Sequence, residues 1–179
     1  MTNDICMLTT KDFTILEVMR ERCMGRDDPL VPLLDRKLEC ARVVFSDDIP
    51  ENVATLNSRV TFHAGGNGPD TRILSHDQMQ HAPVGMYLPI KSLRGLALLG
   101  LSEGQEIVLP GSRGAQERIA LQKVRYQPES ARRARESEKL ALSASRKPKL
   151  TLIHDAGRKL DSSSGIEPGG SDDPGPTAA

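Results

Sequence analysis

The spacing of apolar residues changes near residue 50, and this change constrains the fold more than any other feature of the sequence. Before it, apolar residues recur every three or four positions, as on one side of a helix. They are Phe13, Leu16, Met19 and Cys23, and then Val31, Leu34, Leu38 and Ala41. After Val53 the period shortens toward two, which is typical of strands. The sequence therefore predicts an α+β protein, with a helical segment at residues 1–50 and a sheet domain at residues 51–129.

The N-terminal segment carries the signals of two helices joined by a tight turn. Thr9 is placed to cap the first helix, and Asp12 follows three residues later, as in a capping box. Asp27 and Asp28, followed by Pro29, are typical of a turn. We therefore expect a short antiparallel helical hairpin with Asp27 and Asp28 at its tip.

The two carboxylates at the tip permit two interpretations. Magnesium takes oxygen ligands and often completes its shell from a partner, whereas adjacent acids are also ordinary turn residues. The turn interpretation is favoured. His63, His76 and His81 lie in or near loops without the further ligands of a zinc site. The sequence predicts no metal site and no cofactor.

The domain that follows contains signals for an antiparallel sheet. Residues 59–63 and 72–74 flank one Gly-rich turn, and residues 106–109 and 116–126 flank another. Between them, Ser92 is a plausible N-cap for one short helix at residues 93–99. This helix is almost entirely apolar, so we expect it to pack against the sheet and at least two of its leucines to be core residues.

The last strand changes its apolar parity along its length. Ile119 and Leu121 share one parity, whereas Val124 has the other. A constant apolar face requires one extra residue between them, so we predict a β-bulge near Gln122 and Lys123.

Composition excludes several classes of function. Lys plus Arg and Asp plus Glu are both 24, so no net charge draws the chain toward nucleic acid or a membrane. No run of apolar residues is long enough to span a membrane. Three Phe, two Tyr and no Trp are too few for a platform that stacks single-stranded bases. We find no nucleotide-binding loop or nucleophile motif, so we expect no catalytic residues, no small-molecule substrate and no enzyme activity.

Cysteine usage favours the cytoplasm. Cys6, Cys23 and Cys40 are odd in number and 17 residues apart, which excludes a CxxC pair and argues against a secreted disulfide framework. We expect reduced, structural thiols.

The C-terminal segment, residues 130–179, changes composition. A basic stretch from Arg132 to Lys149 is interrupted by Glu136 and Glu138. It either neutralises nucleic-acid phosphates or forms a solvated helix face, and charge patterning favours the helix face. Residues 161–179 are nearly all Ser, Gly, Pro, Asp or Ala, and we expect residues 130–179, first basic and then rich in Ser, Gly and Pro, to form a disordered tail.

Three segments together resemble one family. They are Thr55-Leu56-Asn57-Ser58-Arg59-Val60, the run Ser92-Leu93-Arg94-Gly95-Leu96-Ala97-Leu98-Leu99-Gly100-Leu101 with Gly104, and Tyr126-Gln127-Pro128-Glu129. In order and spacing they resemble the T-x-N-S-x-V, S-P-x-G-x-A-L-L-G-L-x-x-G and Y-Q-P-E motifs of Rnk-type regulators of nucleoside diphosphate kinase, in the Gre transcription factor superfamily. The resemblance spans residues 11–129. Leu93 replaces the family's Pro, and Gln105 replaces its usual acid.

The resemblance implies a short coiled-coil hairpin ahead of an FKBP-like domain that binds RNA polymerase at its secondary channel. Nucleic acid is then met only through the transcription complex. The implied polymerase contacts are Ser92, Leu93, Arg94, Gly95 and Leu98. Gre factors carry acids to the catalytic magnesium on a long coiled coil. Helices of about fifteen residues, or roughly 20 to 25 Å, are too short for this, so we expect competition with Gre factors without transcript cleavage.

Two other hypotheses remain open. Peptidyl-prolyl isomerases share the implied fold, although fold does not carry function. Their pockets are lined by aromatic residues, and this domain has only Phe62, Tyr87 and Tyr126. The third hypothesis is a DNA- or RNA-binding tether that acts through the basic stretch.

Overall fold

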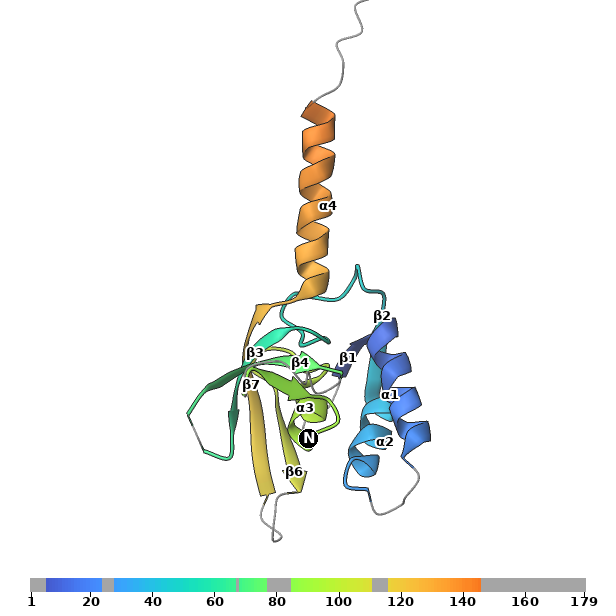
Figure 1. Cartoon of the computed structure of the whole chain (residues 1–179), viewed down its shortest axis with the longest axis vertical. Coiled ribbons are helices and arrows are strands. Elements are labelled where there is room, and N and C mark those ends of the chain that lie inside the picture. The colour runs from blue at the N-terminus through green and yellow to red at the C-terminus, as the bar shows by residue number, and fades with distance from the viewer. Residues whose placement is uncertain (1–5, 24–27, 67, 77–84, 111–115, 146–179) are drawn as a thin grey trace, which may run out of the picture. The chain divides into compact units, whose positions relative to one another are not determined.

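The computed structural model describes residues 6–23, 28–66, 68–76, 85–110 and 116–145, which belong to one compact unit, residues 1–146 (Figure 1). Its elements are β1 (Cys6–Thr9), α1 (Thr10–Arg22), α2 (Val31–Cys40), β2 (Ala41–Val44), β3 (Arg59–Ala64), β4 (Asp70–Ser75), β5 (Tyr87–Pro89), α3 (Leu93–Leu98), β6 (Glu106–Pro110), β7 (Gln116–Tyr126) and α4 (Pro128–Ser145). The α+β class is confirmed. The tail predicted to be disordered at 161–179 lies outside the described residues.

The domain is built on a five-stranded sheet with the order β5-β4-β3-β7-β6. The pairs β4–β3, β3–β7 and β7–β6 are antiparallel, as predicted. The edge strand β5, however, runs parallel to β4. The expectation of a wholly antiparallel sheet is therefore wrong at this edge. A parallel partner requires a long connection between the two strands, and β4 ends at Ser75 whereas β5 begins only at Tyr87.

The predicted bulge in β7 is confirmed. Phe62 pairs with Leu121 and Thr61 pairs with Lys123, so Gln122 is the extra residue. This insertion changes the parity of β7 and places Val124 opposite the buried Val60. A second register shift, between Arg59 and Val60, was not predicted.

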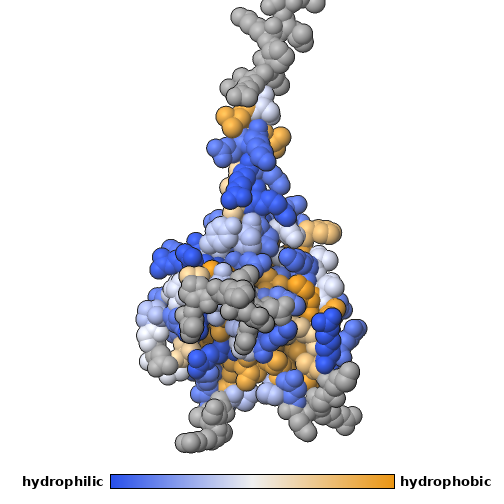
Figure 2. All heavy atoms as spheres, viewed as in Figure 1, coloured by the Kyte–Doolittle hydropathy of each residue, from blue (hydrophilic) through white to orange (hydrophobic). Residues whose placement is uncertain are grey.

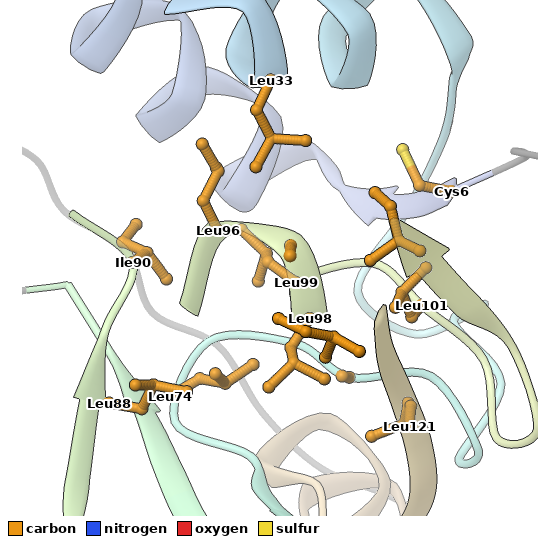
Figure 3. Close-up of a cluster of buried hydrophobic side chains, with 14 of the residues drawn as sticks. Cys6, Leu33, Leu74, Leu88, Ile90, Leu96, Leu98, Leu99, Leu101 and Leu121 are labelled. Carbon is orange, nitrogen blue, oxygen red and sulfur yellow. The ribbon is translucent and has the colours of Figure 1, made fainter. Parts of the chain in front are cut away.

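Helix α3 forms the centre of the core. Ser92 caps it, as predicted, and Gly100 follows it at φ +81°, the left-handed conformation that favours glycine. Leu96, Leu98 and Leu99 are all fully buried. Their side chains pack between α2 on one side and the sheet on the other (Figure 3). The helix therefore joins the hairpin and the sheet in one core.

The helical hairpin consists of α1, with 13 residues, and α2, with 10. Both are shorter than predicted. The Thr9 hydroxyl accepts a hydrogen bond from the Asp12 backbone N–H at 3.1 Å, which confirms the cap of α1. An ion pair between Arg20 and Asp35 links the two helices. Ala41, which the apolar stripe assigned to the second helix, begins β2 instead.

Strands β1 and β2 were missed because each has only four residues, too few to show a period. One strand precedes the hairpin in the sequence and the other follows it. The two strands pair in parallel, with Cys6 opposite Ala41. The Met7 N–H donates to the Gly100 carbonyl at 2.9 Å. This small sheet therefore ties the two ends of the hairpin together and ties both to the turn after α3.

Helix α4 corrects part of the predicted disorder, because residues 130–145 are helical. Pro128 occupies the first helical position, where its missing N–H is not needed, and Glu129 lies in the first turn. The segment is poor in large apolar residues, which suggested a tail, yet it is rich in Ala, Arg, Glu, Lys and Leu, which favour a helix. Figure 2 shows that most of its surface is hydrophilic. This agrees with the interpretation of a solvated helix face.

Candidate functional site

The turn that leads into α3 is rigidly built. The Ser92 hydroxyl accepts a hydrogen bond from the Gly95 N–H at 3.1 Å and donates one to the Pro89 carbonyl at 2.7 Å. A Cβ atom at Gly95 would lie 2.1 Å from that same carbonyl oxygen. Glycine is therefore required at this position by close packing, and Ser92 holds the start of the helix against the end of β5.

The predicted contact residues divide into exposed and buried groups. Arg94 is exposed, and Ser92 and Leu93 are half-buried. Gly95 and Leu98 are buried, and Leu98 has no exposed surface. Leu98 cannot offer its side chain to a partner, because its position on α3 points it into the core (Figure 3). The accessible part of this surface is the N-terminal turn, Ser92 to Arg94.

Arg94 is held in place by Glu117 of β7. Its Nε lies 3.1 Å from one carboxylate oxygen, and a second N–H donates to the other oxygen. This hydrogen bonding raises the pKa of Arg94 above its already high usual value. A guanidinium has five N–H donors, and the bonds to Glu117 use two of them. Arg94 can therefore also bind an acidic group of a partner.

The tip of the hairpin is described only in part. Asp27 lies outside the described residues. Asp28 accepts a hydrogen bond from the Leu30 N–H at 2.9 Å through a carboxylate oxygen, and its backbone carbonyl accepts one from Val31. Asp28 thus performs the turn chemistry that the sequence favoured. No group of acids, histidines and cysteines within the described residues could hold a metal ion.

A pocket of about 360 Å³ lies next to this tip. It is lined by residues from the end of α1, from the start of the turn to α2, and from the domain: Val18, Met19, Arg22, Cys23, Asp28, Leu30, His76 and Lys91. Apolar side chains from the hairpin form part of its wall, and charged groups lie around it. No local sequence pattern predicts this pocket, because its walls are far apart in the chain: even Leu30 and His76 are separated by 46 positions.

Lys37 is a feature that the sequence analysis missed. It is only 2% exposed, and its ammonium group donates to the backbone carbonyl of Leu99, at the end of α3. The lysine thus provides a hydrogen-bond donor to a carbonyl at the helix end, where carbonyls lack intrahelical partners. One signal could have revealed it. Lys37 lies three residues after the buried Leu34, on the apolar side of α2.

Two of the segments that carry the family resemblance meet in space. The Thr55 hydroxyl donates to the Glu129 carboxylate at 2.6 Å and hydrogen-bonds to Ser58 at 2.9 Å. The Gln127 side-chain NH₂ donates to the carbonyls of Pro50 and Val53, both at 2.8 Å. These residues are a structural connection between the start of the domain and the base of α4, rather than a contact surface.

Two arginines of the basic stretch have partners within the protein. Arg132 forms an ion pair with Asp47 at 2.5 Å. Arg133 donates to the carbonyls of Ser46 and Asp47 at 3.3 and 3.1 Å. They dock the first turns of α4 on the loop after β2, which weakens the hypothesis of a nucleic-acid tether.

No helix in the described part of the chain combines the length and apolar character needed to cross a membrane. No family model matches the chain, and no curated protein matches it. Solved structures do. The chain is similar to a prokaryotic transcription elongation factor GreA/GreB from Nitrosomonas europaea, with 30% sequence identity, a TM-score of 0.52, and coverage of 68% of this chain and 98% of that chain.

Two further structures match at lower similarity. GreA factor homologue 1 (Gfh1) of Thermus thermophilus has 16% identity and a TM-score of 0.32, over 68% of this chain and 99% of that one. Gfh1 of Thermus aquaticus has 14% identity and a TM-score of 0.34, over 66% and 97%. The relationship rests on the Nitrosomonas protein.

Proposed function

Because the chain belongs to the GreA/GreB family of prokaryotic transcription elongation factors, we propose that it binds RNA polymerase at the secondary channel and competes there with Gre factors without stimulating transcript cleavage. We also propose the finer assignment, an Rnk-type regulator with a coiled-coil hairpin and an FKBP-like domain that influences nucleoside diphosphate kinase levels. The three sequence segments described above support this finer assignment.

The length of the hairpin carries the proposal. At about 1.5 Å per residue, the 13 residues of α1 extend about 20 Å and the 10 residues of α2 about 15 Å. Cleavage by a Gre factor requires acids delivered to the catalytic magnesium through the channel. A hairpin of this length is too short to carry acids through the channel to the catalytic magnesium, so we expect binding without cleavage.

The N-terminal turn of α3 is the proposed contact surface. Ser92 and Gly95 fix its backbone, and Arg94 extends from it with its guanidinium held by Glu117. A positioned guanidinium favours binding because little side-chain freedom is lost on contact. An acidic group on polymerase is the matching partner.

Competition binding tests this proposal. Labelled chain bound to purified polymerase core should be displaced by a Gre factor, and stalled, backtracked complexes should show no cleavage above background when the chain is added. Arg94→Ala should weaken binding about tenfold, the loss of one charge-assisted contact. Arg118→Ala is the matched control, since Arg118 is also exposed and paired, with Glu106 at 3.2 Å.

Three results would contradict the proposal. They are binding that a Gre factor does not displace, equal binding by both arginine variants and wild type, and cleavage that disappears in Asp27→Ala plus Asp28→Ala. The last result would make the tip acids metal-positioning residues.

A further inference from the structure

Two of the three cysteines lie side by side, although 34 positions separate them in the chain. The Cys6 and Cys40 sulfur atoms are 3.9 Å apart. Cys6 lies on β1 and is 2% exposed, and Cys40 is the last residue of α2 and half-buried. The parallel pairing that places Cys6 opposite Ala41 brings the two backbones together. The sulfur atoms therefore meet as a direct result of the β1–β2 pairing.

This pair belongs to the joint between the hairpin and the domain. Both thiols face the Lys37 backbone carbonyl, at 3.5 Å from Cys6 and 3.9 Å from Cys40. The side chain of the same lysine binds the Leu99 carbonyl. On the other side, a Cβ atom added to Gly100 would lie 3.3 Å from the Cys6 Cβ. The two cysteines thus occupy the contact between β1, α2 and the end of α3.

We propose that Cys6 and Cys40 form an oxidisable pair, which a hydroperoxide converts to an intramolecular disulfide that links β1 to the end of α2 and so locks the two ends of the hairpin together. Their proximity and their place in the joint support this inference. It does not depend on polymerase binding. Cys23, at the end of α1, lies outside the joint and provides an internal comparison.

The reaction proceeds in two steps. The Cys40 thiolate attacks a peroxide oxygen, breaks the O–O bond and becomes a sulfenic acid, and the alkoxide that leaves is protonated to an alcohol, or to water from hydrogen peroxide. The Cys6 thiolate then attacks the Cys40 sulfur, and the hydroxide that leaves is protonated to water. Two thiols lose two electrons and two protons in total, and the peroxide accepts them.

The roles of the two cysteines follow from their surroundings. Cys40 is the more accessible to an oxidant in solution. Burial raises the pKa of Cys6 to about 11, so little of it is thiolate at neutral pH. Cys6 therefore acts as the resolving thiol, and the second step is slow and becomes faster as pH rises.

The disulfide would restrain the joint without a large rearrangement. It would close a loop that contains all of α1 and α2, and such a loop limits the freedom of the unfolded chain. The two thiol contacts with the Lys37 carbonyl would be replaced by a covalent bond from β1 to α2. The expected result is a higher melting temperature, by several degrees.

The experiment uses the full chain with Cys23→Ser, treated with hydrogen peroxide at pH 7 and pH 8.5. Peptide mapping without reductant should identify a Cys6–Cys40 disulfide in a chain of unchanged oligomeric state, formed faster at pH 8.5. Dithiothreitol should reverse both the disulfide and the increase in melting temperature. Cys6→Ser in the same background is the control, in which the melting temperature should not rise.

Several outcomes would overturn the proposal. One is Cys40 oxidised to sulfinic acid while Cys6 remains a thiol, and another is a disulfide between two chains. In the wild-type chain, a disulfide through Cys23 would equally contradict it. These outcomes are read from the peptides of the Cys23→Ser and wild-type chains, so they stand even where Cys6→Ser does not fold.

Discussion

Helices α3 and α4 owe their structure to different sources. Helix α3 has six residues, of which Gly95, Leu96, Ala97 and Leu98 are buried. A helix this short is not stable alone, so packing against the sheet and α2 holds it. Helix α4 has 18 residues, and its described side chains from 134 onward are exposed. Local helix propensity and the contacts at its base hold it instead. Although both segments are helices, we therefore expect substitutions in α3 to destabilise the protein strongly and substitutions in the exposed part of α4 to have little effect.

The largest expected effect is in α3. Leu98→Asp places an unpaired carboxylate in the core, which should lower the free energy of unfolding by about 4 kcal/mol or abolish folding. Leu142→Asp in α4 is the matched control. Leu142 is 57% exposed, so its change should stay within about 0.5 kcal/mol. Urea unfolding monitored by circular dichroism measures both. A folded Leu98→Asp chain that has lost only polymerase binding would show that this comparison is wrong.

The same contrast explains what the sequence could predict. The apolar periods of the hairpin, β3, β7 and α3 reflect burial, and these elements were found. Apolar spacing could not reveal α4, because this helix buries little. Charge patterning favoured a solvated helix face there, although residues 130–179 as a whole were expected to be disordered. The contact of Thr55 with Glu129 joins residues 74 positions apart, and no local pattern encodes such a distance.

The candidate site was predicted in the same uneven way. Ser92 was identified as a cap from local chemistry, and the structure confirms it. Leu98 was offered as both a core and a contact residue, and only three-dimensional packing decides between these roles. The hydrogen bond from Lys37 to the Leu99 carbonyl joins residues 62 positions apart, and the proximity of Cys6 to Cys40 depends on β1, a strand too short to predict.

A second, intermediate effect on stability is expected from Asp12, whose carboxyl group is influenced by the charge of Glu129 at the base of α4. Asp12 is 1% exposed. Burial, together with the neighbouring charge of Glu129, raises its pKa to about 6. The folded state thus holds this proton more tightly than the unfolded state, whose pKa is near 3.8. The contribution of Asp12 to stability should therefore be greatest below about pH 4, decrease as pH rises to about 6, and stay level above it, with a total change of about 3 kcal/mol.

Asp12→Asn should remove this decrease. The variant should be more stable than wild type at pH 7, and the difference should shrink toward pH 4. Urea unfolding of both chains at several pH values isolates this residue, because their other acids are the same. If the stabilities of the two chains instead changed in parallel with pH, Asp12 would not be desolvated. The base of α4 would then respond to mutation like the exposed part of the helix.

The smallest expected effect comes from removing α4 itself. A chain that ends at Glu129 keeps the Thr55 and Gln127 contacts. It loses the hydrogen bonds of Arg133 to Ser46 and Asp47, and it loses the Arg132–Asp47 pair, in which both side chains are at least half exposed. Exposed pairs contribute about 0 to 1 kcal/mol, so the melting temperature should fall by no more than about 4 °C. A chain that ends at Ser145 is the control and should match the full chain.

A larger loss of stability in the Glu129 chain alone would show that α4 stabilises the domain through its length. A loss that already appears in the Ser145 chain would instead assign packing to residues 146–179. Unchanged stability in both would leave propensity and a few contacts at its base as the source of α4, in contrast to α3.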